Sequence, residues 1–106
     1  IGLAAALAFA ERGLKLCLID LPGPKLVAAR DAVAARAGSA DAVEAIAADV
    51  ADADAMTAAA ADVAARFGPV AVLMNNAGIA GRAPVFGPIE NWRRVIDVNL
   101  WGIIHG

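Results

Sequence analysis

The chain alternates between stretches with apolar residues at helical spacing and short, continuous apolar runs. Apolar residues at intervals of three and four positions predict amphipathic helices. The ranges that carry this spacing are 3–12, 25–37, 52–67 and 92–103. Gly13, Gly38 and Gly68 follow the first three ranges, at the place where a helix commonly ends. Asp52 or Asp54 is expected to cap the third helix at its N-terminus.

Three short apolar runs between the helices are expected to be strands. They are 14–19, 42–48 and 70–74. The second run is only weakly strand-like because Glu44 interrupts it, and we assign it as a strand from the alternation of elements. Helices that alternate with strands predict an α/β fold, in which helices cover both faces of a parallel sheet. A chain of 106 residues is expected to form one domain.

A polar residue follows each predicted strand: Asp20, Asp49 and Asn75. In an open parallel sheet the carboxyl ends of the strands share one edge, where ligands bind, so these residues are expected to converge. A carboxylate such as Asp20 can accept two hydrogen bonds from a vicinal diol such as a ribose, and it would repel a 2'-phosphate. The alternatives stay open: Asp20 as a solvated loop acid or as part of an Asx-type turn before proline, and Asp49 as a helix cap.

Two segments that contain asparagine add candidate chemistry. The third apolar run stops at Asn75-Asn76-Ala77-Gly78. Gly78 permits close approach of the backbone to a ligand, although a plain turn gives the same pattern. Asn99 interrupts the apolar stripe of the last helix and is expected to face inward if the helix is regular. Since a buried carboxamide needs partners, Asn99 either serves a site or bonds to neighbouring backbone or an ordered water.

Charge and composition exclude several classes of function. The net charge is −2 without a run of Lys or Arg, so no nucleic-acid partner is expected. The longest apolar stretch, 3–10, is shorter than the about 20 residues that span a bilayer, so no membrane segment is expected. The only cysteine, Cys17, is expected to be a small buried hydrophobe, and the chain fits a reducing cytoplasm. Nothing at metal-ligand spacing accompanies the only histidine, His105, so no metal site is expected.

Taken together, these residues resemble the classical short-chain dehydrogenases/reductases along the full length of the chain. Asn75-Asn76-Ala77-Gly78 is similar to the family's Asn-Asn-Ala-Gly motif after its fourth strand. Val98-Asn99-Leu100, with Gly102, is similar to its helix motif. Ile1-Gly2 is similar to the last two residues of its Gly-x-x-x-Gly-x-Gly sequence, which precedes a helix whose N-terminus faces the pyrophosphate.

The resemblance implies a Rossmann-type doubly wound parallel sheet that is incomplete here, because the family's first strand lies upstream of Ile1 and its C-terminal half downstream of Gly106. Residues 1–106 would form part of one dinucleotide-binding domain. The distances from Ile1-Gly2 to Asp20 and to Asp49-Val50 match the family's layout, in which those positions bind the adenosine ribose and the adenine. The cofactor-binding residues implied are Ile1, Gly2, Asp20, Asp49, Val50, Asn76, Ala77, Gly78 and Val98.

The resemblance also implies an NAD-dependent oxidoreductase that transfers hydride between nicotinamide and a small-molecule alcohol or ketone. Asp20 implies NAD because no Arg or Lys directly follows it to pair with a 2'-phosphate, while NADP stays open. Asn99 corresponds to the asparagine of the family's catalytic tetrad. The tetrad's serine, tyrosine and lysine are expected downstream, and the chain contains no tyrosine. Without that acid/base group, the segment alone is expected to be inactive.

Further expectations concern partners and rival functions. Trp92 and Trp101 are nine residues apart on the last helix, so one is expected to pack on the sheet and the other to face outward. Relatives commonly pair through the helix corresponding to residues 90–105, which implies a homo-oligomer. A non-catalytic dinucleotide-binding module or redox sensor fits the same residues. An alanine-rich helical packing protein, suggested by the 29 alanines, leaves the polar strand ends unexplained.

Overall fold

The computed structural model describes residues 1–80 and 87–106. The elements in chain order are α1 (Gly2–Glu11), β1 (Leu16–Asp20), α2 (Pro24–Ala37), the 3-10 helix η1 (Ala40–Ala42), β2 (Val43–Ala47), α3 (Ala53–Phe67), α4 (Ile89–Ile96), the π-helical stretch η2 (Asp97–Trp101) and α5 (Gly102–His105). The four predicted helices and the first two predicted strands are confirmed. The glycine- and proline-rich sequence of residues 78–88 favours a loop. Residues 78–80 and 87–88 are irregular, and residues 81–86 lie outside the described residues.

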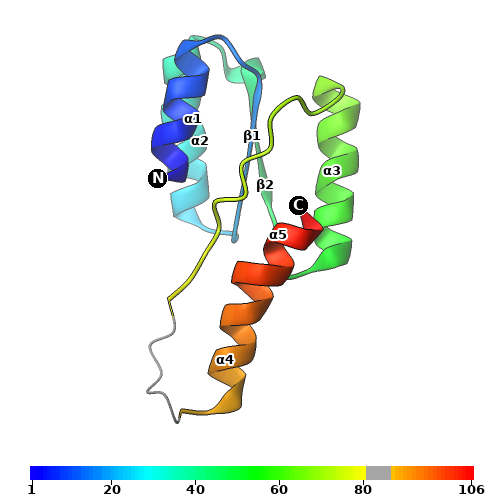
Figure 1. Cartoon of the computed structure of the whole chain (residues 1–106). Helices are drawn as coiled ribbons and strands as arrows, with labels where there is room; N and C mark the ends of the chain where they lie inside the picture. Colours follow the sequence, from blue (N-terminus) through cyan, green and yellow to red (C-terminus); the bar gives the residue numbers. More distant parts are fainter. Residues whose placement is uncertain (81–86) are drawn as a thin grey trace.

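The two strands are parallel and pair in register from Leu16 opposite Val43 to Asp20 opposite Ala47. Helices α1 and α2 cover one face of this pair and α3 lies on the other (Figure 1). The core lies between the strands and the first two helices, and it consists of Ala6, Ala10, Val33, Ala34 and Val43. Small alanine side chains let these layers approach closely. The predicted α/β arrangement is therefore confirmed for the described residues.

The N-terminus of α3 is capped by Asp52. Its Oδ1 accepts hydrogen bonds from the N–H groups of Asp54 and Ala55, each at 3.0 Å. These donors belong to the first turn of the helix and have no partner within it. Asp52 is therefore the residue that caps this helix, and the Asp49 side chain is available for other contacts.

The strand predicted at 70–74 is wrong. This segment runs in the same direction as β1 (Figure 1), but the sheet of the described residues contains β1 and β2 alone. A parallel strand exists only through hydrogen bonds to a neighbour, and within residues 1–80 and 87–106 this segment pairs with neither β1 nor β2. Its side chains are correspondingly open, with Val70, Val72 and Leu73 each more than half exposed. The apolar run indicated an extended backbone, while pairing depends on a partner that local sequence does not specify.

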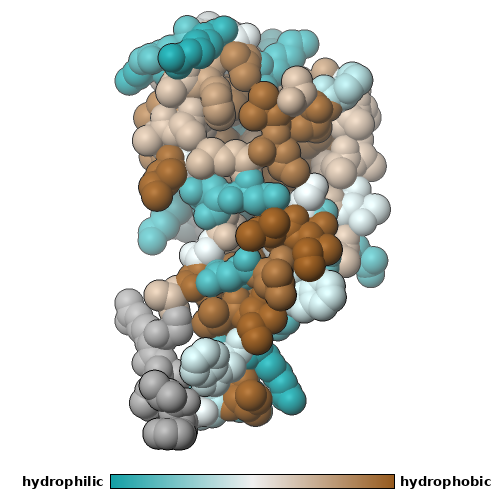
Figure 2. Space-filling view, in the orientation of Figure 1, coloured by the Kyte–Doolittle hydropathy of each residue, from teal (hydrophilic) through white to brown (hydrophobic). Residues whose placement is uncertain are grey.

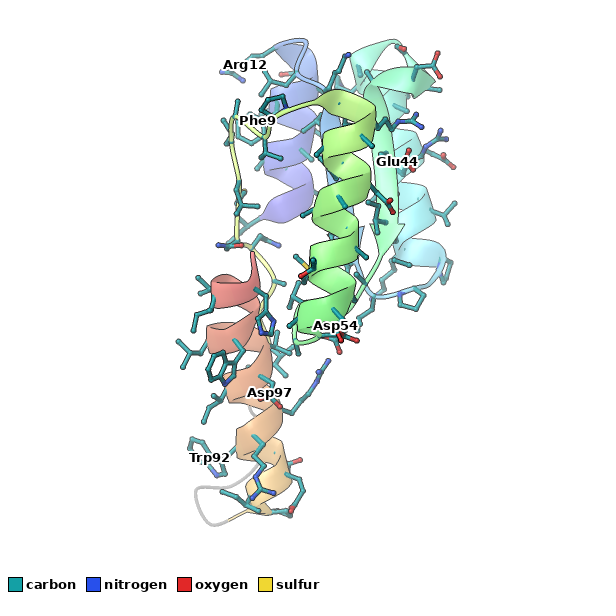
Figure 3. All side chains as sticks on the ribbon, turned by 90° about the vertical axis from the view of Figure 1, so that its right-hand side faces the viewer. Phe9, Arg12, Glu44, Asp54, Trp92 and Asp97 are labelled. Atoms are coloured by element: carbon teal, nitrogen blue, oxygen red, sulfur yellow. The ribbon has the colours of Figure 1, made fainter. Side chains whose placement is uncertain are left out.

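The last helical region runs without a break from Ile89 through η2 to His105, and it projects from the rest of the molecule (Figure 1). The whole molecule, this helix included, measures 49 × 24 × 21 Å. Both tryptophans are exposed, Trp92 at 43% and Trp101 at 47%. Figure 3 shows Trp92 at the far end of this helix, away from the strands. The expectation that one tryptophan packs on the sheet is wrong, because the helix extends past the two strands. None of the described helices combines the length and apolar character that a bilayer crossing requires.

Candidate functional site

Asp20 is the last residue of β1 and stands at the carboxyl edge of the sheet. Its main-chain carbonyl accepts the N–H of Ala48 at 3.0 Å, which ties it to the end of β2. Its side chain is exposed, and Oδ1 accepts the N–H of Leu21 at 2.7 Å. Within the described part of the chain the other oxygen, Oδ2, accepts no hydrogen bond. Asp20 thus presents one carboxylate oxygen that is available to a ligand.

Asp49 lies two residues after β2 on the same edge. Its Oδ1 accepts the N–H of Ala51 at 3.0 Å, and its Oδ2 lies 2.9 Å from a guanidinium nitrogen of Arg94 on α4. The N–H of Ala51 and, after it, the Arg94 guanidinium stabilise the ionised form and outweigh the opposing effect of burial. The pKa of the Asp49 carboxyl is therefore below its ordinary value. Asp49 is held as an anion in a fixed orientation.

Val50, the next residue, is in contact with the end of the last helix. Its carbonyl accepts a hydrogen bond from Nδ1 of the half-buried His105 at 2.8 Å, which places the proton of the neutral ring on Nδ1. A Cβ added to Gly102 would lie 2.7 Å from Cγ2 of Val50. Only glycine allows α5 to approach the turn after β2 this closely.

The start of α1 lies beside the Asn-Asn-Ala-Gly turn. A Cβ added to Gly2 would lie 2.6 Å from Nδ2 of Asn76, so a larger residue there would displace the Asn76 carboxamide. The carbonyl of Ile1 accepts the N–H of Ala5 at 3.0 Å and opens the helix. Among the described residues no side chain caps this N-terminus, and no acidic residue lies in its first turn. The predicted residues Ile1, Gly2 and Asn76 are therefore brought together.

Asn99 joins the same group from η2. Its Nδ2 donates to the Ile79 carbonyl, and its Oδ1 accepts the N–H of Ile79, both at 2.8 Å. A Cβ added to Gly78 would lie 3.5 Å from that Oδ1, and exposed Ala77 precedes Gly78. Asn99 is exposed, so the expectation that it faces inward is wrong, while its neighbour Val98 is 4% exposed. The π-helical stretch shifts the angular positions of these residues from those of a regular helix.

Asn75 contacts the last helix and not the edge formed by Asp20 and Asp49. Its Nδ2 donates to the carbonyl of Ile103 at 3.4 Å. The expected convergence of three strand ends is therefore only partly correct. Asp20 and Asp49 share an edge, whereas the Asn-Asn-Ala-Gly turn connects to that edge through α5.

Three contacts of the site were not predicted from sequence: Arg94 with Asp49, His105 with Val50, and Ile79 with Asn99. A signal for the first two does exist. Arg94 and His105 are eleven residues apart, which is close to three turns and puts them on one side of a helix. His105 was considered only as a metal ligand, and its hydrogen bond to Val50 was not predicted.

Other reactive groups of the chain lie outside this site. In the ranges 1–80 and 87–106, no three His, Cys, Asp or Glu side chains are grouped so that they could hold a metal ion. Cys17 is half-buried on β1, and burial raises the pKa of its thiol to about 11. The thiol therefore stays protonated, as expected of a small hydrophobe.

Comparison with known proteins identifies the family. The sequence profile of the short chain dehydrogenases matches residues 1–106. The chain is 32% identical over 108 aligned positions, 99% of its length, to 1-deoxy-11-beta-hydroxypentalenate dehydrogenase from Streptomyces avermitilis. The chain belongs to the short-chain dehydrogenase/reductase family, and the resemblance drawn from its motifs is confirmed.

Solved structures share the fold. NAD+-bound xylitol dehydrogenase matches 98% of the chain with a TM-score of 0.89 at 33% identity. A glucose/ribitol-type short-chain dehydrogenase from Brucella melitensis matches 98% with a TM-score of 0.80 at 33% identity. L-sorbose reductase from Gluconobacter frateurii, complexed with NADPH and L-sorbose, matches 97% with a TM-score of 0.81, and at 24% identity this likeness concerns the fold alone. The fold is Rossmann-type, with an incomplete sheet.

The chain spans only part of each relative. It covers 39% of the Streptomyces dehydrogenase, 40% of xylitol dehydrogenase and 44% of the Brucella protein. These matches establish family and fold, and each of them concerns less than half of the other protein.

Proposed function

We propose that residues 1–106 are part of the dinucleotide-binding domain of an NAD-dependent oxidoreductase, which transfers hydride between nicotinamide and the alcohol or ketone carbon of a small molecule. The observation that carries this proposal is the Asp20 carboxylate, which stands at the carboxyl edge of parallel strands with one oxygen open. In Rossmann-type folds an acidic residue at this place accepts the ribose hydroxyls. Family membership supports the same function.

The chemistry of the residues fits a dinucleotide. The N-terminus of α1, free of side-chain caps among the described residues, offers backbone N–H donors and a positive dipole end to a pyrophosphate. Gly2, which has no side chain, lets the Asn76 carboxamide lie beside that end of the helix. Ile1 and Gly2 would thus contribute backbone to the phosphate site, and Asp20 would hold the ribose of the adenosine half.

The remaining candidate residues are assigned by the family's layout and supported by their grouping. Asp49 and Val50 would line the adenine, since they lie two and three residues after the end of β2. Asn76, Ala77 and Gly78 would support the cofactor along the turn that faces Gly2. Val98 and Asn99 would lie toward the reacting end of the cofactor. When bound, the nicotinamide would supply or accept the hydride.

The choice of NAD over NADP rests on charge. Asp20 would repel a 2'-phosphate, and the next residue, Leu21, carries no charge that could pair with one. The NAD+-bound state of xylitol dehydrogenase, at 33% identity, supports this choice. NADP stays the alternative cofactor.

Catalysis would need groups beyond these 106 residues. The chain contains no tyrosine and covers 40% of xylitol dehydrogenase, so the acid/base group and its lysine and serine partners would come from the rest of the parent protein. Asn99 would be the tetrad member present. A non-catalytic dinucleotide-binding module is the second candidate, and the same residues fit it equally well. The parent would work in the cytoplasm as a homo-oligomer, and the exposed Trp101 on η2 supports that assembly.

Calorimetric titration of the purified full-length parent with NAD and NADP tests the proposal. Saturable binding of NAD, tighter than NADP, together with oxidation of a panel of secondary alcohols, is expected. Binding of NAD without turnover of any alcohol or ketone would establish the non-catalytic module. Failure to bind either dinucleotide would overturn both.

A further inference from the structure

The last helical region makes three contacts with the turn that follows β2. Arg94 pairs with Asp49 at 2.9 Å, His105 bonds to the Val50 carbonyl at 2.8 Å, and Gly102 approaches Val50 so closely that a Cβ would collide with it. These contacts join segments 45 to 55 residues apart in the chain. The turn at residues 49–50 is therefore held from outside as well as by its own backbone.

Arg94 differs in this respect from its neighbour Arg93. The Arg93 guanidinium lies 3.9 Å from Glu90 within the same helix, and both side chains are about 70% exposed. Arg94 reaches a carboxylate on another element, and the two side chains are 45% and 34% exposed. An ion pair that joins two elements restricts their relative position, whereas one within a helix adds little beyond that helix.

We propose that Arg94 and His105 are positioning residues, which hold the Asp49–Val50 turn in the conformation that receives the adenine half of the cofactor. This proposal rests on the proposed function for the identity of the ligand. Asp49 has two anchors, the Ala51 N–H and Arg94. Without Arg94 only the local anchor remains, two residues away on the same turn, and the carboxylate would move with the turn. Binding of the nucleotide would then have to order this turn as well, and that entropic cost would lower the affinity.

The same helix carries Asn99 between the two positioning residues. Asn99 holds Ile79, in the segment that follows the Asn-Asn-Ala-Gly turn. One helix therefore contacts the edge assigned to adenine and the segment after the Asn-Asn-Ala-Gly turn, and it carries Asn99, which is assigned to the reacting end. The helix fixes the spacing of these two parts of the nucleotide site, which a dinucleotide must bridge.

The test uses the full-length parent protein and three probes: NAD, ADP-ribose and nicotinamide mononucleotide. Arg94→Gln is expected to raise the Kd of NAD and of ADP-ribose about fivefold, the most that a partly exposed ion pair supports. The Kd of nicotinamide mononucleotide is expected to stay unchanged. Arg93→Gln is the matched control and leaves all three values unchanged. Arg94→Lys, which keeps the charge, is expected to recover part of the affinity.

His105 has its own pair of variants. His105→Ala is expected to weaken ADP-ribose binding, and His105→Asn to restore much of it, because the Asn amide can donate to the Val50 carbonyl in place of Nδ1. A general loss of folding would weaken all three probes together, and this result would overturn the positioning role. Equal binding by His105→Ala and the unchanged protein would also overturn it.

A double-mutant cycle separates positioning from direct contact. If Arg94 acts through Asp49, adding Arg94→Gln to Asp49→Asn causes little further loss of ADP-ribose binding. Losses that add fully would mean that Arg94 touches the nucleotide itself, and the proposal would be wrong. A parent protein that binds NAD while Arg94→Gln binds ADP-ribose equally well overturns this inference alone. A parent that binds no dinucleotide overturns the proposed function first.

Discussion

Asn99 holds the backbone of Ile79 at two points, since its amide nitrogen donates to the Ile79 carbonyl and its amide oxygen accepts the Ile79 N–H, each at 2.8 Å. A carboxamide can do both at once, because its NH2 group donates and its oxygen accepts. The contact fixes the chain after the Asn-Asn-Ala-Gly turn against the last helix. It gives Asn99 a role in local geometry that adds to the catalytic role implied by the family.

Substitution of Asn99 is expected to reduce turnover more than cofactor affinity. In the full-length parent, Asn99→Ala should lower kcat by about a hundredfold, the lower part of the range for groups that serve proton transfer. The Kd of NAD should change by less than about threefold, because one loop contact outside the adenine site is lost. Asn99→Asp keeps the acceptor and loses the donor, so its kcat should lie between those of the unchanged protein and Asn99→Ala. Steady-state kinetics and calorimetry measure both quantities.

The matched control is Asn91→Ala, an exposed asparagine on the same helix for which the described residues show no side-chain hydrogen bond. It should behave as the unchanged protein. A kcat of Asn99→Ala near that of the unchanged protein would leave Asn99 with a packing role only.

Asp20→Arg is expected to reverse the cofactor preference. The arginine would remove the acceptor for the ribose hydroxyls and place a positive charge where a 2'-phosphate would lie. The ratio of kcat/KM for NAD to that for NADP should fall by about tenfold or more, since about 1.4 kcal/mol corresponds to that factor. The exposed Asp41, before the opposite end of β2, supplies the control Asp41→Arg. An unchanged preference in Asp20→Arg would remove Asp20 from the nucleotide site.

The sequence predicted more of the fold than of the contacts in the site. The elements depend on neighbouring residues, whereas the contacts join residues that are far apart in the chain. The position of Asp20 and Asp49 at one edge of the sheet was predicted correctly, because the end of a strand is a local feature of the sequence. The pairing of 70–74 was not predictable, because a parallel strand depends on a neighbour elsewhere in the chain. The partner of Asn99 and the contact of Arg94 with Asp49 depend on where the last helix docks. No local pattern specifies that position.

Gly102→Ala is expected to destabilise the protein, although glycine to alanine inside a helix normally stabilises by about 1 kcal/mol. The added Cβ would lie 2.7 Å from Cγ2 of Val50, and overpacking of this kind typically costs about 1–3 kcal/mol. Denaturant unfolding of the full-length parent measures the sign of the change in unfolding free energy. Combining Gly102→Ala with Val50→Ala, which removes Cγ2, should recover most of the loss. Stabilisation by Gly102→Ala alone would mean that the helix does not pack on this turn.

Asp49 is expected to make stability depend on pH. The N–H of Ala51, and Arg94 after it, lower the pKa of the folded carboxyl below the unfolded value of about 3.9. A lowered folded pKa contributes stability that is present above the unfolded value and is lost as the pH falls through the folded value. The difference in unfolding free energy between the unchanged protein and Asp49→Asn should therefore be largest near neutral pH and shrink below about pH 4. Asp41→Asn provides the control, and a difference that does not vary with pH would contradict the lowered pKa.

Residues 1–106 produced alone are expected to fold poorly or to aggregate. The segment 70–74 forms no strand and exposes Val70, Val72 and Leu73, and β1 pairs on one side only within the described residues. Figure 2 shows apolar side chains gathered on the face over this segment and over α5, where Ile103 and Ile104 are more than half exposed. An exposed apolar surface next to an unpaired strand edge favours association between copies.

Light scattering and thermal melts of the isolated segment measure this tendency. Val72→Glu should raise the temperature at which the segment aggregates, because it places a charge within the exposed apolar run. Ala58→Glu makes the same change in net charge at an exposed position on α3 and should have a smaller effect. A cooperative melt of the unchanged segment with dispersed amide NMR signals would show that two strands and their helices fold without further pairing. In that case the exposed run at 70–74 would not limit the stability of this part of the fold.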